Sequence, residues 1–168
     1  DFILQNYLYI LISLGISIAV IKLISKTKKG KYMLDYLSLE LPIAGPIVKQ
    51  SMMLRFLGCF SILINNQVPI IQSLTVLENA TYNACLKKTI SETKKNVTRG
   101  HPISKALLKN KSLISPMVAY SISTGEKSGN LGPSLYRVSE FINEELSLNM
   151  KKLSSQLEPL LTLILGAM

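Results

Sequence analysis

The sequence predicts an all-α membrane protein: a transmembrane helix, then a six-helix antiparallel cytoplasmic bundle whose last helix runs into a second transmembrane helix. Three observations predict this class. Residues 2–21 carry no charged side chain, and a run of that length spans a bilayer as a helix. Apolar residues then recur three or four positions apart, with no period-two alternation long enough for a strand. A second apolar run begins at Leu157.

The first segment, residues 1–24, is the predicted transmembrane helix, and the lysines that follow it set its orientation. Basic residues beside a span stay on the cytoplasmic side, so residues 25–156 are expected in the cytosol. Lysines at both ends of this region are expected to contact an anionic lipid surface. These membrane-surface residues are Lys22, Lys26, Lys28, Lys29, Lys31, Lys151 and Lys152.

Residues 25–48 are predicted to form a basic juxtamembrane segment and a linker. Tyr32 and Tyr36 lie among apolar and charged residues, a mixture that suits a short segment at the level of the lipid headgroups. Pro42 and Pro46 then predict a stiff, extended linker, because proline fixes its own backbone and restricts the preceding residue.

Residues 49–156 are predicted to form the helical domain. Its first helix, 49–65, is apolar enough to raise the question of another span, but Arg55 interrupts it and the uninterrupted stretch 57–64 is too short to cross a bilayer. A domain helix with one buried face is therefore expected. Later helices are marked by start and stop residues. These are, in chain order, Pro69, Asn83 with Gly100, Pro102, and Ser115–Pro116 with Gly129.

The last helix is predicted to run from Leu131 toward residue 168, a length of about 57 Å at the usual helical rise. Residues 157–168 would be the truncated start of the second transmembrane helix. Pro159 removes a backbone hydrogen bond and predicts a kink, with Glu158 beside it at the depth of the membrane interface. Because both ends of the chain look cut, we expect a fragment of a larger membrane protein.

Composition limits the chemistry. The chain has two cysteines, Cys59 and Cys85, which we expect to be reduced core thiols, and one histidine. No catalytic, metal or phosphate-loop motif is present, so neither enzymatic activity nor a cofactor is predicted; the glycines of 125–132 suit a tight turn between helices. Eight basic side chains in residues 87–111 form either a contact surface for an acidic partner, membrane or nucleic acid, or simply a solvated face. The net charge is +9.

Five segments, in order, resemble the type II secretion F domain family. Residues 55–56 follow a Leu-Pro-Ile-x-Gly-Pro sequence, and 68–70 and 100–107 resemble later family motifs. Residues 125–131 are similar to the family signature Gly-Glu-x-Ser-Gly-x-Leu, and 157–159 resemble the start of its last membrane helix. Gln67 is a departure, because the family usually has glycine there.

The resemblance implies the C-terminal half of a platform protein in a bacterial or archaeal inner membrane, serving type IV pilus, type II secretion or competence pilus machines. It implies a multi-pass protein that is not an enzyme. Expected partners are a hexameric assembly ATPase, pilin or pseudopilin subunits, other inner-membrane assembly proteins and further copies of the chain, with no nucleic acid. The alternative is a membrane-tethered basic helical domain that binds nucleic acid or anionic lipid.

Two groups of residues are the candidate partner-binding positions on this interpretation. The first is a moving joint between the last two helices. The second is an acidic surface on the last helix, where neighbouring like charges either face a basic partner or are simply solvated. The joint comprises Gly125, Glu126, Gly129 and Leu131, and the acidic surface comprises Glu140 and Glu144.

Overall fold

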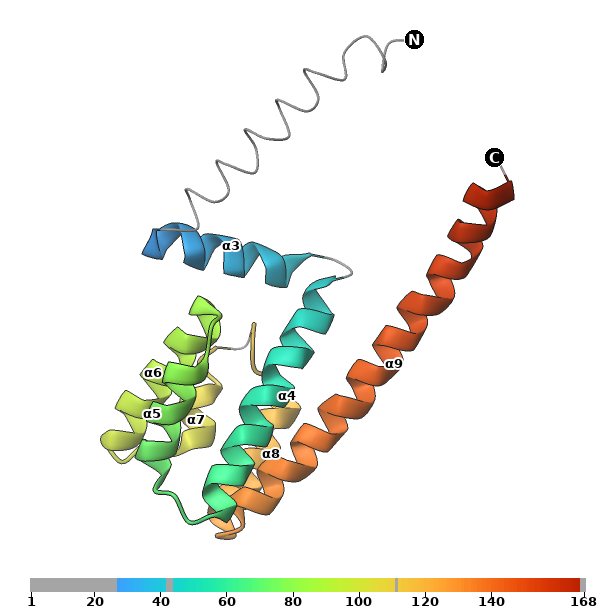
Figure 1. Cartoon of the computed structure of the whole chain (residues 1–168). Coiled ribbons are helices and arrows are strands. Elements are labelled where there is room, and N and C mark those ends of the chain that lie inside the picture. Colours follow the sequence, from blue (N-terminus) through green and yellow to red (C-terminus); the bar gives the residue numbers. More distant parts are fainter. Residues whose placement is uncertain (1–26, 42–43, 111, 167–168) are drawn as a thin grey trace.

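A computed structural model describes residues 27–41, 44–110 and 112–166, with the backbone alone for residues 28, 29, 31 and 156–165. Every regular element in these ranges is a helix, which confirms the all-α prediction. The transmembrane helix predicted at 1–24 lies outside the described residues. The helices, labelled as in Figure 1, are α3 (Lys28–Glu40), α4 (Ala44–Asn65), α5 (Ile70–Ala80), α6 (Ala84–Thr98), α7 (Ile103–Leu107), α8 (Pro116–Lys127) and α9 (Leu131–Gly166).

The helices α4 to α9 form the domain, and α4 and α9 share its largest helix–helix contact (Figure 1). These two helices are antiparallel, since Ser61 near the end of α4 contacts Gly132 at the start of α9, while Gln50 near the start of α4 contacts Asn149. Helix α8 also packs on α9, and α5, α6 and α7 follow one another from α4 round to α8. Helix α3 lies across the end of the bundle from which α9 projects.

One apolar core joins all of these helices. The side chains of Leu57, Phe60, Leu74, Ile90 and Leu135 are fully buried and come from α4, α5, α6 and α9. Their spacing along each helix follows the period of 3.6 residues that was read from the sequence. Burial of each such side chain stabilises the fold by roughly 1.5–3 kcal/mol, so the domain has a substantial core without a disulfide.

Helix α4 begins earlier than predicted. Residues 44–48 are helical, so the expectation of an extended linker through Pro46 is wrong. The reason is position: Pro46 lies in the first turn, where a missing N–H removes no intrahelical bond. Among the described helices, α4 alone has the length and composition to cross a membrane. Its Phe56 and Phe60 are buried within the domain, which agrees with the prediction of a domain helix.

The predicted helix boundaries after α4 are confirmed by local chemistry. Asn83 caps α6, accepting hydrogen bonds from the N–H groups of Cys85 (2.9 Å) and Leu86 (3.1 Å). Ser115 accepts from Val118 N–H at 3.3 Å, with Pro116 in the first turn of α8. Gly100 and Gly129 follow α6 and α8 with φ of 81° and 71°, the left-handed conformation that ends many helices.

The prediction for the cysteines is half right. Cys85 is buried beside α3, and this burial raises the pKa of its thiol. Cys59 is exposed, so its assignment to the core is wrong. The reason is that it sits on α4 one position before the buried Phe60, outside the stripe that faces the core.

Candidate functional site

Gly125 lies where α8 packs tightly against Ser134 of α9. A Cβ atom on it would stand 2.4 Å from both Cβ and Oγ of Ser134, a separation that real side chains do not adopt. After α8 ends, Gly129 turns the chain and Asn130 N–H donates to the Gly125 carbonyl at 2.8 Å. The predicted joint is therefore a tight, closely packed turn, as the glycine spacing indicated.

Glu126 reaches out of this turn to cap a different helix. Its carboxylate accepts hydrogen bonds from Ile103 N–H (2.7 Å), Ser104 N–H (3.3 Å) and Ser104 Oγ (3.0 Å). These groups begin α7, and Pro102 at its N-cap position offers no side-chain hydrogen bond. A carboxylate at a helix N-terminus is also favoured by the helix dipole. Glu126 thus ties α7 to the α8–α9 turn.

The start of α9 is held on its other side by α4. Ser61 Oγ donates to the Gly132 carbonyl at 2.9 Å, and Asn65 Nδ2 donates to Ser61 Oγ at 3.2 Å. A Cβ on Gly132 would meet Asn65 Oδ1 at 2.0 Å, so a larger residue there would displace the Asn65 side chain from its present position. Leu131 is buried beside them. The sequence did not single out Ser61 or Asn65; the only signal was a pair of polar residues near the buried face of an otherwise apolar helix.

The α8–α9 joint, defined as Gly125, Glu126, Gly129, Leu131 and Gly132, therefore lies among the ends of α4, α7, α8 and α9. Gly125 and Leu131 are buried, and Glu126 is half-buried with its carboxylate occupied. None of these three presents a free polar group to solvent. The structure accounts for the signature residues by the contacts they make inside the domain.

The acidic surface on α9, unlike the joint, is exposed to solvent. Glu140 and Glu144 are exposed, one helical turn apart, and neither has a hydrogen bond or ion pair with another described residue. The neighbouring Glu145 accepts from Gln50 Nε2 at 3.4 Å, and Gln50 Oε1 accepts from Asn149 Nδ2 at 2.9 Å. Two carboxylates on the middle of the long helix are thus free to meet a basic partner.

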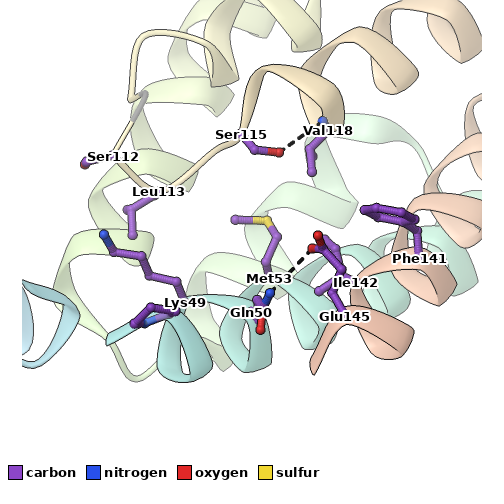
Figure 2. A pocket seen from close by; sticks show the side chains of 11 residues that line it. Lys49, Gln50, Met53, Ser112, Leu113, Ser115, Val118, Phe141, Ile142 and Glu145 are labelled. Atoms are coloured by element: carbon purple, nitrogen blue, oxygen red, sulfur yellow. Dashed lines mark hydrogen bonds between the residues drawn. The ribbon is translucent and has the colours of Figure 1, made fainter. Parts of the chain in front are cut away.

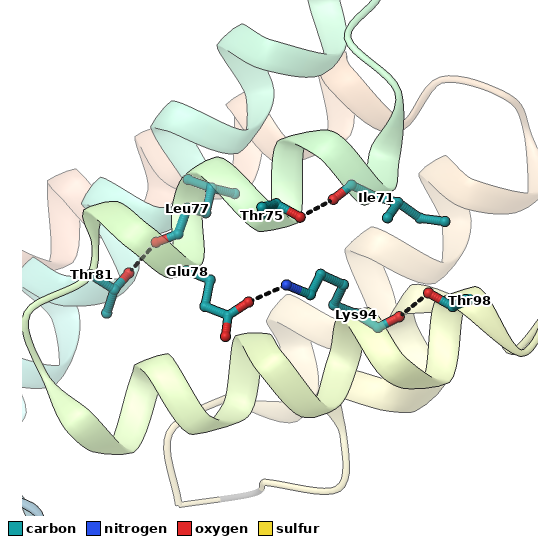
Figure 3. A network of polar contacts seen from close by, with 7 residues as sticks. All are labelled: Ile71, Thr75, Leu77, Glu78, Thr81, Lys94 and Thr98. Carbon is teal, nitrogen blue, oxygen red and sulfur yellow. Dashed lines mark hydrogen bonds and ion pairs between the residues drawn. The ribbon is translucent and has the colours of Figure 1, made fainter. Parts of the chain in front are cut away.

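The described basic residues of 87–110 lie on α6, on α7, in the turn between these helices and just after α7. Most are exposed, including Lys87, Lys95 and Lys105. Lys94 is different, because it forms an ion pair with Glu78 of α5 (Figure 3). The hydrogen bond from this ammonium group lowers the pKa of the Glu78 carboxyl below its ordinary value of 4.5. This pair joins α5 to α6 and has a structural role.

A groove of about 260 Å³ lies between the start of α4, the segment before α8 and the middle of α9 (Figure 2). Met53, Val118 and Ile142 form its apolar floor, with Lys49 and Glu145 as the charged groups around it. Within the described part of the chain, no three histidine, cysteine or acidic side chains come together to bind a metal. The groove presents apolar surface with no set of reactive groups.

The predicted membrane-surface residues divide by position. Lys151 and Lys152 are exposed on α9. The backbone of Lys28, Lys29 and Lys31 lies in the first turns of α3. Lys22 and Lys26 lie outside the described residues. Helix α9 continues through positions 158 and 159 to Gly166. The kink at Glu158 and Pro159 and the membrane insertion of this segment stay predictions.

The described part of the chain is thus an all-helical domain with a glycine-tight α8–α9 turn, a carboxylate cap across that turn and a long terminal helix. Residues 56–168 match the family described as Type II secretion system (T2SS), protein F, and the chain belongs to this family. This confirms the resemblance read from residues 125–131.

The similarity to curated proteins points to the same family. The chain is 26% identical over 140 residues to a type IV pilus assembly protein PilC of Thermus thermophilus, covering 83% of this chain and 34% of that protein. It is 27% identical over 169 residues to a PilC of Pseudomonas aeruginosa, covering 100% and 45%. A type II secretion system protein F of Vibrio cholerae is 30% identical over 102 residues, covering 61% and 25%. The chain spans less than half the length of these relatives.

Proposed function

We propose that this chain is part of a platform protein in the cytoplasmic membrane of a pilus or type II secretion machine. Its domain would lie on the cytosolic side, contact a hexameric assembly ATPase and pass the motion of that ATPase to pilin or pseudopilin subunits in the membrane. The role would be mechanical, without catalysis or a cofactor. Family membership supports this reading over a nucleic-acid-binding domain.

The observation that carries the proposal is the continuity of α9. One helix of 36 residues begins inside the α8–α9 joint and continues to Gly166, a distance of about 54 Å. Its first turns are buried through Leu131, Leu135, Val138 and Ile142. A displacement of the bundle must therefore displace the far end of the helix, which is the apolar segment expected to enter the membrane.

We assign the ATPase contact to the acidic surface, Glu140 and Glu144. The joint residues, being engaged inside the domain, would transmit force rather than touch the partner. Free carboxylates on a rigid helix suit a basic partner surface, and reversing such a charge at an interface costs several kcal/mol through like-charge repulsion. This assignment narrows the candidate contact to two residues.

Co-purification tests the proposal. The full-length protein that contains this chain is purified in mild detergent from cells that express the assembly ATPase, and the recovered ATPase is quantified. Glu140→Lys and Glu144→Lys should each lower recovery by at least about tenfold, since each 1.4 kcal/mol of the expected loss corresponds to a factor of ten. Glu92→Lys, an exposed acidic position on α6, is the matched control and should leave recovery unchanged.

Two results would count against the proposal in different ways. Equal recovery with all three variants would remove the assigned contact surface. A complete absence of ATPase with the unaltered protein, together with normal pili and secretion after deletion of its gene, would remove the platform function itself.

A further inference from the structure

Helix α3 carries an unpartnered apolar face at one end of the domain. Its exposed side chains include Met33 (69% exposed), Leu37 (59%) and Tyr36, which fall at i, i+3 and i+4 and therefore share one side of the helix. The opposite side packs on the bundle through Leu39, which is 4% exposed. The outward face is thus apolar in its middle, with Glu40 at its C-terminal end.

The helix is firmly attached to the domain. Asp35 Oδ2 accepts from Ala84 N–H at 2.7 Å, so α3 helps to cap α6. The chain passes so closely from α3 to α4 that a Cβ on Gly45 would stand 2.4 Å from the Leu39 carbonyl oxygen. Lys88 Nζ lies 5.4 Å from the centre of the Tyr32 ring, a cation–π distance. Because of these contacts, whatever binds the outward face of α3 also fixes the orientation of the whole domain.

Chain length restricts what can reach this face. The charge-free run ends at Ile21, six residues before Thr27, where α3 is capped. Six residues extend at most about 20 Å, so a membrane that holds residues 2–21 lies within that distance of the start of α3. Helix α9 also projects from the domain at this end (Figure 1).

The chemistry around the face suits a membrane surface. Lysines lie before and within the first turns of α3 in the sequence, and the exposed Lys88 of α6 lies beside Tyr32 of α3. Tyr82, 89% exposed, lies in the short connection beside the Asp35–Ala84 contact. Tyrosine and lysine around methionine and leucine are typical of helices that lie in a lipid interface. The carboxylate of Glu40 on the same face limits the depth to the headgroup level.

We propose that α3 lies flat in the cytoplasmic headgroup layer of the membrane, with Met33, Tyr36 and Leu37 against the lipid, and holds the domain at a fixed orientation to the bilayer. This inference rests on the membrane placement in the proposed function. Beyond that membrane placement, the domain would rest on the bilayer through α3 as well as through its two terminal segments.

Depth-dependent fluorescence quenching tests the proposal. The full chain, with the exposed Cys59 replaced (Cys59→Ser), receives a single cysteine at Leu37→Cys for an environment-sensitive dye, and is reconstituted in phosphatidylcholine vesicles containing phosphatidylglycerol. A spin label near the lipid headgroup should quench the dye at position 37 at least about twofold more than a dye at Tyr120→Cys, an exposed site on α8. Aqueous iodide should show the reverse order. The buried Cys85 is left in place, and a Cys59→Ser chain without an introduced cysteine, treated with the same dye, corrects for any reaction at Cys85.

A third label, at Ile12→Cys, separates the two ways of failing. Quenching at position 12 by a spin label deep in the bilayer, with position 37 open to iodide, would overturn the role of α3 and leave the membrane placement intact. Protection of position 37 from both quenchers would show that protein covers the face, and would also overturn the proposal. No quenching at position 12 would reject the membrane placement itself, and the inference with it.

Discussion

Replacing Glu126 by alanine should release the N-terminus of α7 and destabilise the whole domain. The change leaves two amide N–H groups, of Ile103 and Ser104, and the Ser104 hydroxyl without their acceptor. Helix α7 has five residues, too few to be stable by its own hydrogen bonds. Its order therefore depends on this carboxylate and on the burial of its apolar side chains.

The size of the effect follows from those three hydrogen bonds. A hydrogen bond to a charged group contributes about 1.5–3 kcal/mol when buried, and loss of a helix cap costs about 0.5–2 kcal/mol. Glu126 is half-buried, so the lower parts of these ranges apply and the expected loss for Glu126→Ala is about 2 kcal/mol. Glu126→Gln keeps one accepting oxygen, so it should lower the unfolding free energy by about half as much as Glu126→Ala. Either loss is a large fraction of the 5–15 kcal/mol that stabilises a typical domain.

Urea unfolding of the full chain in detergent measures the total effect, and hydrogen exchange locates it. The amides of Ile103 and Ser104 should lose protection in both variants before the core of α4 does. Glu144→Ala, at an exposed glutamate on α9, is the control and should change stability by less than about 0.5 kcal/mol. If Glu126→Ala and Glu144→Ala unfold at the same urea concentration, the carboxylate does not hold the joint and the reasoning fails.

Four further substitutions test three other features. Gln67→Gly should raise the unfolding free energy by roughly 0.5–1 kcal/mol, because Gln67 adopts a left-handed φ of 61°; an unchanged melting temperature would contradict this. Thr93→Val should leave the unfolding free energy unchanged or raise it, since the Thr93 hydroxyl is buried without a hydrogen-bond partner. Thr89→Val should lower the unfolding free energy by about 1–2 kcal/mol in the same urea assay, because the Thr89 hydroxyl accepts from Asn110 Nδ2 and donates to the Cys85 carbonyl. The pKa of the Glu78 carboxyl is lowered in the folded domain, so its ion pair with Lys94 should stabilise the fold by at most about 1 kcal/mol above pH 4.5. This stabilisation should be lost as the pH falls through the lowered pKa of folded Glu78. Lys94→Met should remove that part of the pH dependence of the unfolding free energy.

Features set by neighbouring residues were predictable from the sequence. Asn83 and Ser115 cap helices within three residues of themselves, and Gly100 and Gly129 end helices through their own backbone freedom. The departure at Gln67 falls at a position that favours glycine: α4 ends in the hydrogen-bond pattern usually completed by glycine, with Gln67 at a φ of 61° and Val68 N–H donating to the Leu63 carbonyl at 3.0 Å.

Features that join distant segments were not predictable in this way. Glu126 lies more than twenty positions from the helix it caps, and Ser61 lies 71 positions from Gly132. No periodicity connects such pairs, because their proximity is decided by how whole helices pack. The error at Cys59 has a different, local cause: Cys59 lies outside the apolar stripe of α4, one position before the buried Phe60, so the helical period alone would have placed it on the exposed side.

On the proposed function, the stiffness of the connection between the domain and the membrane depends on how much of α9 is unsupported. Helix α4 braces α9 from Gly132 to Asn149, at whose far end Gln50 accepts the amide hydrogen bond. From Asn149 to the apolar segment that begins at Leu157 is about 12 Å of helix, little more than two turns. A free rod of that length bends little, since helices in proteins curve with radii of about 60–100 Å. The contacts of the joint and of α4 therefore leave the segment around Glu158 and Pro159 as the one place where α9 could yield, and a kink there would redirect motion at the membrane rather than absorb it within the domain.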